Sequence, residues 1–339
     1  MTLRWGLAGT GNIARTFANA LGSSATSTLA AVASRTADRA EGFAAEYAGP
    51  GPVLALDYDT LVDHPDIQAI YVATPHPQHA DWVLRALRAD KHVLCEKPMG
   101  LNYPEVMAMV DAAADADRFL MEAFMYRCHP QTRELQSLLE GGAIGTVRQI
   151  RASFGFSTSP RPESRLFAPE LGGGGIMDVG CYTTSIARLI AGAALGLSTP
   201  AEPVSVQGVA HIGERGRVDE WASASVLFPN DIVADLFCGT AIGVQSDVRI
   251  WGTGGSLVVP APWKPIQGQI VLNRAGAEPE SIEVPSGMDC YALEADVIAR
   301  SMGGREAPYP CMTWQDSLGN MKALDQWRAA VGLVFDAER

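Results

Sequence analysis

The sequence predicts an α/β protein of two domains: a doubly wound parallel sheet comes first, and an α+β domain with a mostly antiparallel sheet follows it. Three observations support this prediction. The chain has 339 residues, more than a single hydrophobic core ordinarily serves. Apolar strands alternate with helical patterns up to about residue 125. Near Ile150, short alternating runs broken by turn residues replace that pattern.

The first domain is expected over residues 1–125, where strands and helices take turns. It opens with a strand, a glycine-rich turn and a helix over residues 3–21. Further strands are predicted at 28–34, 69–75, 92–98 and the start of 119–130. Helices are predicted at 35–47, 77–90 and 103–117. Strands that alternate with helices in this way predict a parallel sheet covered on both faces.

The second domain is expected over residues 126–339 and is rich in strands. Alternating runs that favour an antiparallel sheet with one buried face occupy 147–157, 204–212, 221–229, 231–239, 248–259, 268–273 and 280–285. A helical stretch, 174–192, lies within this half, and helical patterns return from about Tyr291. We expect the last helix, 316–338, to pack back on the first domain.

Composition excludes several classes of function. The formal net charge is -12, which argues against binding nucleic acid or an anionic membrane, since both require clustered Lys and Arg. No run of about 18 apolar residues is present, and glycines interrupt the N-terminal apolar stretch before a signal-peptide core forms. The six cysteines are dispersed without a C-x-x-C pair. We therefore expect reduced thiols in a cytoplasmic protein.

The first turn carries a dinucleotide fingerprint. Gly9, Gly11 and Ala14 form G-x-G-x-x-A after an apolar strand and at the start of a helix. The first glycine allows the tight turn, the second admits a pyrophosphate to the backbone, and the small alanine lets helix and strand pack closely. The helix N-terminus then offers unpaired N–H groups to phosphate. The residues expected to contact the nucleotide here are Gly9, Thr10, Gly11, Asn12 and Ile13.

The end of the second strand bears on the choice of cofactor. A 2′-hydroxyl of NAD favours an acidic partner there, and the 2′-phosphate of NADP requires a cation. The sequence offers Ser34 and Arg35, with Arg39 one helical turn on, and its first carboxylate is Asp38, inside the helix. NADP is therefore favoured, with NAD as the alternative. The competing interpretation makes Arg35 an ordinary solvated surface residue.

Two further strand ends meet the same edge of the predicted sheet, where ligands bind in open α/β folds. The first carries Thr74, Pro75, His76 and His79, and the second carries Glu96 and Lys97 before Pro98. The proline fixes the backbone, which favours a directed Glu96–Lys97 pair over a solvated one. No third ligand accompanies the two histidines, so no metal site is predicted.

These motifs together resemble one family. In chain order they are G-x-G-x-x-A, ATPHPQH, EKP, MEAFMYRCHP and GGGGIMDVGCY. They are similar to the glucose-fructose oxidoreductase / inositol dehydrogenase / rhizopine-catabolism (Gfo/Idh/MocA) family, and the resemblance covers nearly the whole chain. It implies a Rossmann domain, a C-terminal domain with a large open sheet, and pyridine-nucleotide hydride transfer on sugars, cyclitols or related diols.

The resemblance also assigns roles. Lys97 becomes the active-site lysine, Glu96 contacts cofactor or positions that lysine, and Arg127 touches cofactor or substrate, although a structural salt bridge is the competing interpretation. Asp178 and Tyr182, four residues apart and so on one helical face, match the family's D-x-G-x-H/Y motif. Tyrosine at the last position departs from the histidine of many inositol and sugar dehydrogenases of the family, and resembles the glucose-fructose oxidoreductase and dimeric dihydrodiol dehydrogenase branches. The alternatives are a packed tyrosine and an aspartate that caps the helix.

The leading hypothesis is an NADP-dependent oxidoreductase acting on a sugar, cyclitol or cyclic diol, with Lys97, Tyr182 and Asp178 as catalytic residues. Two other hypotheses stay open: a redox sensor that binds the nucleotide without turnover, and an NAD-dependent glycoside hydrolase. We also expect a homodimer or homotetramer formed through the exposed face of the C-terminal sheet. Open sheets with apolar outer positions seldom stay bare, and similar proteins often pair there.

Overall fold

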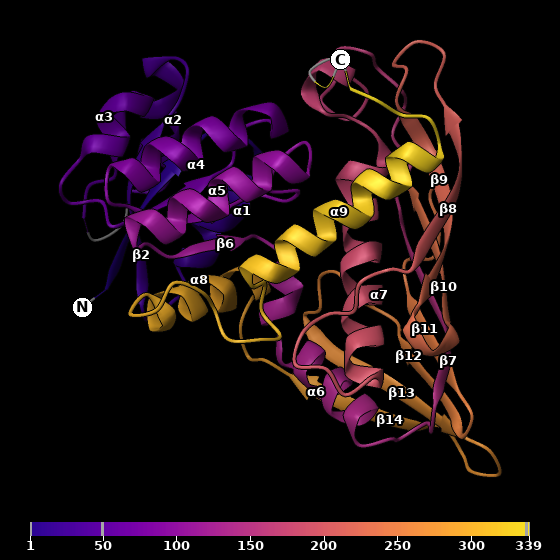
Figure 1. The fold of residues 1–339 in the computed structure, drawn as a ribbon. Helices are drawn as coiled ribbons and strands as arrows, with labels where there is room; N and C mark the ends of the chain where they lie inside the picture. Colours follow the sequence, from indigo (N-terminus) through magenta and orange to yellow (C-terminus); the bar gives the residue numbers. More distant parts are fainter. Residues whose placement is uncertain (1, 49–50, 336–337, 339) are drawn as a thin grey trace. The chain divides into compact units, whose positions relative to one another are not determined.

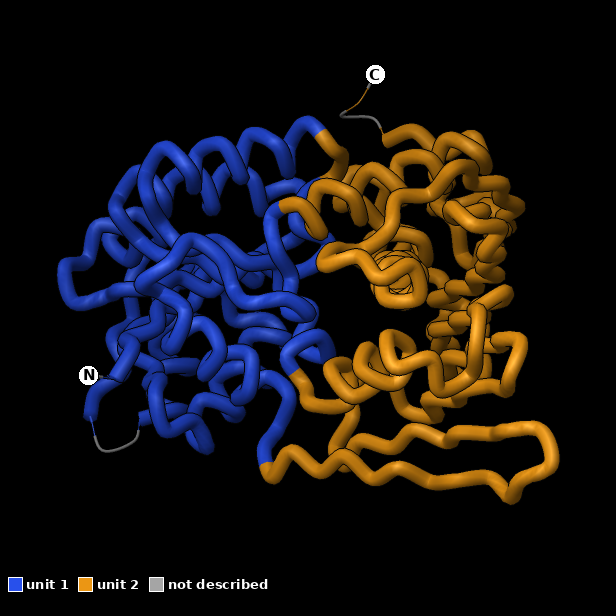
Figure 2. Tube along the Cα trace, turned by 60° about the horizontal axis from the view of Figure 1, so that its bottom comes forward, with its two compact units in different colours: residues 1–100, 104–128, 288–314 blue, residues 101–103, 129–287, 315–339 orange. Residues whose placement is uncertain are grey.

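The computed structural model describes residues 2–48, 51–335 and 338. The chain divides into two compact units (Figure 2). Unit 1 contains residues 1–100, 104–128 and 288–314, and unit 2 contains 101–103, 129–287 and 315–339. The expected boundary after residue 125 lies close to the division after Cys128. Residues 288–314 differ from the expectation, because they belong to unit 1.

Unit 1 is built on a parallel sheet, as the sequence predicts (Figure 1). Its strands are β1 (Leu3–Ala8), β2 (Ser27–Ala33), β3 (Leu54–Leu56), β4 (Ala69–Val72), β5 (His92–Cys95) and β6 (Leu120–Glu122). Their order is β3-β2-β1-β4-β5-β6, and all neighbours pair in parallel. Its helical elements are α1 (Asn12–Leu21), α2 (Ala37–Glu46), α3 (Tyr58–Asp63), η1 (His76–Gln78), α4 (His79–Arg88), α5 (Tyr103–Ala116), η2 (Met125–Cys128) and α8 (Cys290–Ser301). The sequence analysis missed β3 and α3, which are too short to show a period.

Helices bury the apolar strands of this sheet. Every residue of β4 is buried, and Phe17 of α1 lies between Trp5 and Tyr71, with ring centroids 5.2 Å and 4.2 Å away. Helix α8 packs against α1 and also contacts β2 and η2. These contacts explain why a segment so late in the chain belongs to unit 1. The last helix, α9 (Trp314–Ala330), belongs to unit 2 from Gln315 onward.

Unit 2 holds a larger, mostly antiparallel sheet. Its strands are β7 (Val147–Gly155), β8 (Ser205–Ile212), β9 (Asp219–Phe228), β10 (Ile232–Gly239), β11 (Val248–Gly252), β12 (Gly255–Val259), β13 (Gln267–Arg274) and β14 (Glu280–Pro285). Their order is β14-β13-β12-β11-β7-β10-β9-β8, and only the β7–β10 pair is parallel among them. The other helical elements are α6 (Pro130–Glu140), η3 (Pro169–Leu171), η4 (Ile176–Gly180), α7 (Cys181–Ala194) and η5 (Pro229–Asp231).

Helices cover one face of this sheet. Figure 1 shows α6, α7 and α9 on the same side of it, with α7 against β7 and β10. A buried ion pair ties α7 to α9: Arg188 lies 2.7 Å from Asp316, and neither side chain is exposed. Arg188 also lies 2.6 Å from Glu202. Such pairs cost desolvation, but leaving one partner alone would cost more, so they fix the packing of α7.

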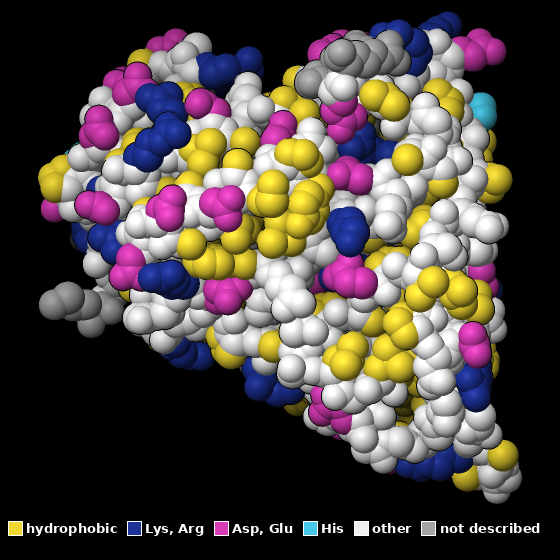
Figure 3. Space-filling view, in the orientation of Figure 1, with side chains coloured by type: hydrophobic (Ala, Val, Ile, Leu, Met, Phe, Trp, Pro, Cys, Tyr) yellow, Lys and Arg dark blue, Asp and Glu magenta, His cyan; other side chains and the backbone are white. Residues whose placement is uncertain are grey.

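Surface charges are mixed rather than segregated. On the face drawn in Figure 3, Lys and Arg side chains are interspersed with Asp and Glu over both units. Among the described residues no helix is long and apolar enough to cross a membrane. Within the same residues, no group of three or more His, Cys, Asp or Glu side chains is placed to hold a metal ion.

Candidate functional site

The glycine turn after β1 leaves room for a nucleotide. Gly9 has φ +123°, and a Cβ there would lie 2.8 Å from the carbonyl oxygen of Ala73, so only glycine fits. Gly11 is the N-cap of α1 with an ordinary φ of -74°. No described atom lies within 4 Å of the position that its Cβ would take. The start of α1 therefore presents backbone N–H groups to open space, as a pyrophosphate requires.

The side chains around this turn are small and polar. The Thr10 hydroxyl lies 3.1 Å from the Ser34 hydroxyl, which links the turn to the end of β2. Asn12 begins α1 and is exposed, while Ile13 is half-buried. The orientation of the turn thus rests on one hydroxyl pair and on the backbone.

Two arginines stand at the start of α2, beyond β2. Arg35 and Arg39 are both exposed, and within the described residues neither guanidinium makes a hydrogen bond or an ion pair. Burial raises the pKa of the Tyr58 phenol, and the positive charge of Arg35 partly opposes that rise. The Arg35 guanidinium therefore lies near Tyr58. Both cations are therefore available to an anion at the end of β2.

The end of β4 carries a buried polar group with no partner. Thr74 is 8% exposed, and its Oγ1 makes no hydrogen bond within the described residues. Pro75 is the N-cap of η1, and the ring of His76, which is 7% exposed, meets the His79 ring edge-on at 5.6 Å. An orphaned hydroxyl at a strand end is compatible with a ligand that supplies the missing bond.

His79 lies between two backbone carbonyl groups of unit 1, and its expected contact with the cofactor stays a prediction. Its side chain is fully buried, with Nδ1 3.0 Å from the carbonyl oxygen of Pro98 and Nε2 2.9 Å from that of Thr74. Burial lowers the pKa of His79 to about 4, so the ring is neutral at physiological pH. Because a neutral imidazole has one N–H, the ring donates to one of these two carbonyl oxygens and lies close to the other, between the loops after β4 and β5.

Glu96 and Lys97 follow β5, and hydrogen bonds fix the glutamate. The Tyr71 hydroxyl donates to Glu96 Oε1, and the backbone N–H of Lys97 donates to Oε2 over 3.2 Å. Burial and the Glu96 charge raise the pKa of Tyr71 well above its usual range, so Tyr71 stays a donor. Lys97 is half-buried, and Glu96 is 7% exposed. The glutamate is thus held from inside the sheet.

Arg127 makes contacts within unit 1, and its expected contact with cofactor or substrate stays a prediction. It is 1% exposed and lies in η2. Its Nε donates to the carbonyl oxygen of Pro310 over 2.7 Å, and its Nη1 lies 3.3 Å from the sulfur of Met312. This guanidinium ties η2 to the segment after α8, which is a structural role within unit 1.

In unit 2, Asp178 and Tyr182 lie where a π-helical turn passes into an α-helix. Asp178 is within η4, and its N–H donates to the carbonyl oxygen of Gly174 over 3.0 Å. Tyr182 is in the first turn of α7, and each of the two side chains is 5% exposed. The sequence predicted a regular helix here. Single π-helical turns inside helices occur most often at functional sites.

Aromatic rings surround Tyr182. Phe154, near the end of β7, stacks on Trp263 with centroids 5.3 Å apart and planes at 10°. The Tyr182 ring meets both edge-on, at 5.3 Å and 5.8 Å. The Trp263 indole N–H donates to the carbonyl oxygen of Ser153 over 3.1 Å, which fixes that ring. The tyrosine thus stands in an apolar wall whose members hold one another in place.

Arg165 is a site residue that the sequence analysis missed. Its Nη1 lies 2.9 Å from Asp178 Oδ1, with the arginine side chain 53% exposed and the aspartate side chain 7% exposed. Arg165 comes from the connection between β7 and η4, which has no regular pattern. Nothing in that connection distinguishes Arg165 from Arg161, so no sequence signal could have found it.

Together these features define what each unit can do. Unit 1 offers a nucleotide turn, two available arginines and a lysine at a strand end. Unit 2 offers a phenol and a carboxylate beside an apolar wall. A phenol or a lysine can each take part in proton transfer, and an apolar wall beside the phenol excludes water from that group.

Comparisons with known proteins agree with this division. Residues 3–124 match the oxidoreductase family with an NAD-binding Rossmann fold, and residues 132–258 match the GFO/IDH/MocA C-terminal domain. Trans-1,2-dihydrobenzene-1,2-diol dehydrogenase of Mus musculus is 32% identical over an alignment of 350 residues that covers 100% of both chains.

Solved structures agree over nearly the whole chain. Aldose-aldose oxidoreductase from Caulobacter crescentus, complexed with glycerol, superposes with a TM-score of 0.87 at 26% identity, covering 98% of each chain. KijD10, a 3-ketoreductase from Actinomadura kijaniata in complex with NADP and TDP-benzene, gives 0.85 at 28% identity, again covering 98% of each chain. The resemblance stated from the sequence is confirmed: the chain belongs to the Gfo/Idh/MocA family of oxidoreductases.

Proposed function

We propose that this protein is an NADP-dependent oxidoreductase that acts on a hydroxyl-bearing carbon of a sugar, cyclitol or cyclic diol. The observation that carries the proposal is the Asp178–Tyr182 pair at one buried helix start, beside the stacked rings of Phe154 and Trp263. When bound, the nicotinamide supplies hydride acceptance and donation at its C4. The dispersed spacing of the six cysteines supports our proposal that the enzyme works in the cytoplasm.

The chain's own groups would manage the proton and the orientation of the substrate. The deprotonated Tyr182 phenolate would take the proton from the substrate hydroxyl on oxidation, and the resulting phenol would return it on reduction. Lys97 stabilises the developing alkoxide or phenolate with its positive charge. Asp178 accepts a hydrogen bond from a substrate hydroxyl, and its pairing with Arg165 fixes the carboxylate for that contact. Glu96, held by Tyr71, keeps the strand end that bears Lys97 in one orientation.

The aromatic wall favours a ring with one apolar face. Phe154 and Trp263 present nearly parallel planes, against which a flat ring or the C–H face of a sugar can pack. The names of the relatives, a dihydrobenzenediol dehydrogenase and an aldose-aldose oxidoreductase, support both substrate types. A screen of aldoses, keto-sugars, inositols and trans-diols, followed at the reduced-nicotinamide absorbance band, tests the proposal.

The two alternatives make different forecasts for that screen. A redox sensor would bind the nucleotide and turn over none of the compounds. A glycoside hydrolase that oxidises its substrate only transiently would cleave glycosides without accumulating reduced cofactor. Stoichiometric accumulation of NADPH with a free diol or aldose would support net oxidation.

The glycine turn gives the first prediction. Gly11→Ala should keep the thermal stability of the protein, because its Cβ meets no described atom within 4 Å. It should weaken NADP binding about tenfold or more, since the methyl group would occupy the space needed by the pyrophosphate. Fluorescence titration and thermal unfolding measure both. Gly42→Ala in α2, where a Cβ also meets nothing within 4 Å, is the matched control. Unchanged NADP affinity in Gly11→Ala would count against a pyrophosphate at this turn.

Cofactor choice gives the second prediction. The kcat/KM ratio should favour NADP over NAD by about tenfold or more, roughly 1.4 kcal/mol, a modest contribution for one phosphate–guanidinium contact. Arg35→Asp should remove this preference, while Arg88→Asp, the same charge change at an exposed position of α4, should keep it. Equal kcat/KM values for both cofactors in the unmodified enzyme would refute the NADP assignment.

Proton transfer gives the third prediction. Tyr182→Phe should lower kcat about 10²–10⁴-fold, the usual effect of losing a positioned proton-transfer group. NADPH binding should change little. Lys97→Ala should cost a similar factor, and the double variant should lose much less than the product, because residues that act as one unit are not additive.

Tyr103→Phe is the control for this series. Like Tyr182, Tyr103 belongs to unit 2, and it is half-buried, but we assign no proton transfer to it. It should keep normal turnover, as measured by steady-state rates with the substrate found in the screen. A Tyr182→Phe enzyme within about threefold of the unmodified rate would end the tyrosine mechanism.

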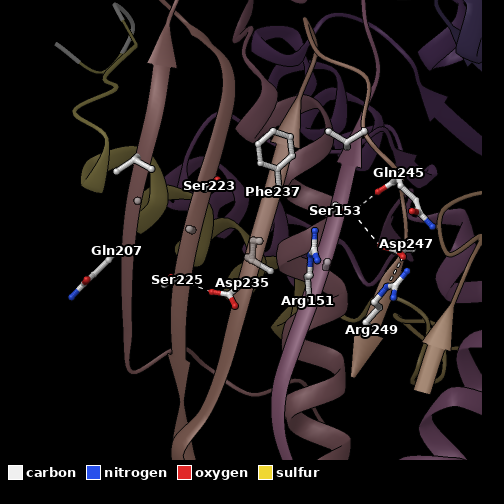
Figure 4. A pocket seen from close by; sticks show the side chains of 16 residues that line it. Arg151, Ser153, Gln207, Ser223, Ser225, Asp235, Phe237, Gln245, Asp247 and Arg249 are labelled. Atoms are coloured by element: carbon white, nitrogen blue, oxygen red, sulfur yellow. Dashed lines mark hydrogen bonds and ion pairs between the residues drawn. The ribbon is translucent and has the colours of Figure 1, made fainter. Parts of the chain in front are cut away.

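The uncovered face of the unit 2 sheet is our proposed subunit interface. A row of mostly polar side chains crosses five strands of it (Figure 4): Gln207, Ser225, Asp235, Arg151 and Arg249. These residues help to line a shallow concavity of about 790 Å³. The face is more polar than the sequence suggested, although Val209 is 72% exposed and Val233 41%. Opposite charges on one patch suit a two-fold contact, in which Arg151 of each copy can meet Asp235 of the other.

Association gives the fourth prediction. Light scattering at micromolar concentration should report two or four copies of the chain. Val209→Arg should shift the protein toward the monomer without lowering its unfolding temperature, because that side chain is already exposed. Met107→Arg, which changes an exposed apolar residue of unit 1 in the same way, should leave the assembly intact. A monomeric unmodified protein would contradict the proposal.

A further inference from the structure

A buried aspartate lies directly beneath the turn that leads to Asp178. Asp219, the first residue of β9, has no exposed surface. Its Oδ2 accepts a hydrogen bond from the backbone N–H of Ile176 over 2.7 Å. Its other oxygen, Oδ1, is buried and has no hydrogen-bond partner among the described residues. A fully buried carboxylate with one unsatisfied oxygen is costly, so its place in the fold calls for a reason.

The glycine-rich turn is shaped around this carboxylate. Gly174 has φ +114°, and a Cβ there would lie 2.2 Å from Asp219 Oδ1. A Cβ on Gly175 would lie 3.2 Å from Oδ2 and 3.3 Å from the Cα of Gly239. Only glycines let the backbone approach the acid so closely. The turn and the carboxylate therefore depend on each other.

The same turn sets the start of the helix with the reactive groups. The carbonyl oxygen of Gly174 accepts the N–H of Asp178, and Ile176 begins η4. Tyr182 follows one turn later in α7. An anion at the N-terminus of a helix also interacts favourably with the helix dipole. A shift of this turn would move Asp178 directly and Tyr182 through the helix.

We propose that Asp219 is a positioning residue, which holds the turn at Gly174–Ile176 and so sets the orientation of Asp178 and the helix start that bears Tyr182. This inference rests on the proposed function of those two residues. Asp219 itself touches neither substrate nor cofactor in this scheme. It acts through the backbone of the turn.

The protonation state of Asp219 matters for this role. Burial raises the pKa of Asp219 to about 7. The backbone N–H groups of Ile176, Asp219 and Gly175 and the positive charge of Arg328 on α9 act in the opposite direction and lower it. The other titratable groups nearby are Cys238 on β10, whose pKa is raised by burial and by Asp219, and Asp178 and Cys181. The ionised carboxylate is the stronger acceptor, so the turn should be held more tightly above the pKa than below it.

The free energy of unfolding of the whole protein should change with pH in the opposite direction, and decrease as Asp219 ionises. Because the pKa of Asp219 in the folded protein lies above its ordinary value of 3.8, the folded protein binds the proton more tightly than the unfolded chain. Stability therefore falls as pH rises from 3.8 through about 7. Asn in place of Asp219 has nearly the same shape and carries no charge to bury. Asp219→Asn should therefore fold, while losing the ionisation.

The fifth prediction tests Asp219 in two ways. Asp219→Asn should lower kcat/KM about 10- to 100-fold, chiefly through kcat, because a misplaced proton donor costs rate. The kcat/KM of the unmodified enzyme should show a step near pH 7, where Asp219 ionises, and the variant should lack that step. In hydrogen exchange of the unliganded full chain, the backbone of residues 174–183 should exchange faster in this variant than in the unmodified protein. Glu214→Gln, an exposed acid five residues before Asp219, should change neither measurement.

Hydrogen exchange of the unmodified protein needs no substrate. It can therefore test the role of Asp219 even if the proposed function is wrong. For local openings that break the Ile176 hydrogen bond but leave Asp219 buried on β9, protection of residues 174–183, corrected for intrinsic rates, should be greater about one unit above the pKa of Asp219 than about one unit below it. Equal protection at the two pH values would overturn the inference, even if Asp219→Asn failed to fold. A variant whose pH profile and exchange match the unmodified protein would overturn it as well.

Discussion

Buried carboxylates that accept backbone N–H groups hold both chain segments to which we assign chemistry. In unit 1, Glu122 at the end of β6 accepts from Met99, in the loop after β5, over 2.9 Å. In unit 2, Asp219 accepts from Ile176, just before Asp178, over 2.7 Å. The two acids are 2% and 0% exposed. A carboxylate tolerates the loss of water only where N–H groups replace it, so each acid and its loop stabilise one another.

This arrangement separates the groups that react from the groups that hold them. In the proposed mechanism Tyr182 changes charge and Lys97 keeps its positive charge, while other residues fix the backbone that bears each of them. Glu96 illustrates the division in unit 1: its carboxylate is satisfied by Tyr71 and by a backbone N–H. Reacting groups on such supported segments need little reorganisation in the transition state, which is where electrostatic catalysis gains its advantage.

The sequence predicted those parts of the site that depend on local geometry. The tight turn at Gly9 needs a positive φ, and only glycine supplies it without strain, so the pattern is visible in the letters. Contacts between distant segments leave no such mark. No sequence pattern shows that Arg127 donates to the carbonyl oxygen of Pro310, which lies 183 residues away. The pairing of Arg165 with Asp178 depends on the path of an irregular connection, which no period encodes.

Strand β7 connects the two surfaces of unit 2. Side chains alternate along a strand, so Arg151 faces the uncovered side and Phe154, three residues on, faces α7 and the Tyr182 ring. Ser153 makes a hydrogen bond to a residue of each surface. Its hydroxyl donates to the carbonyl oxygen of Gln245, and its own carbonyl oxygen accepts from the indole N–H of Trp263. The surface that we assign to subunit contact and the wall that we assign to the substrate ring therefore share one strand. Because neighbours on a paired strand cannot shift independently, association through the outer row would also fix the aromatic wall.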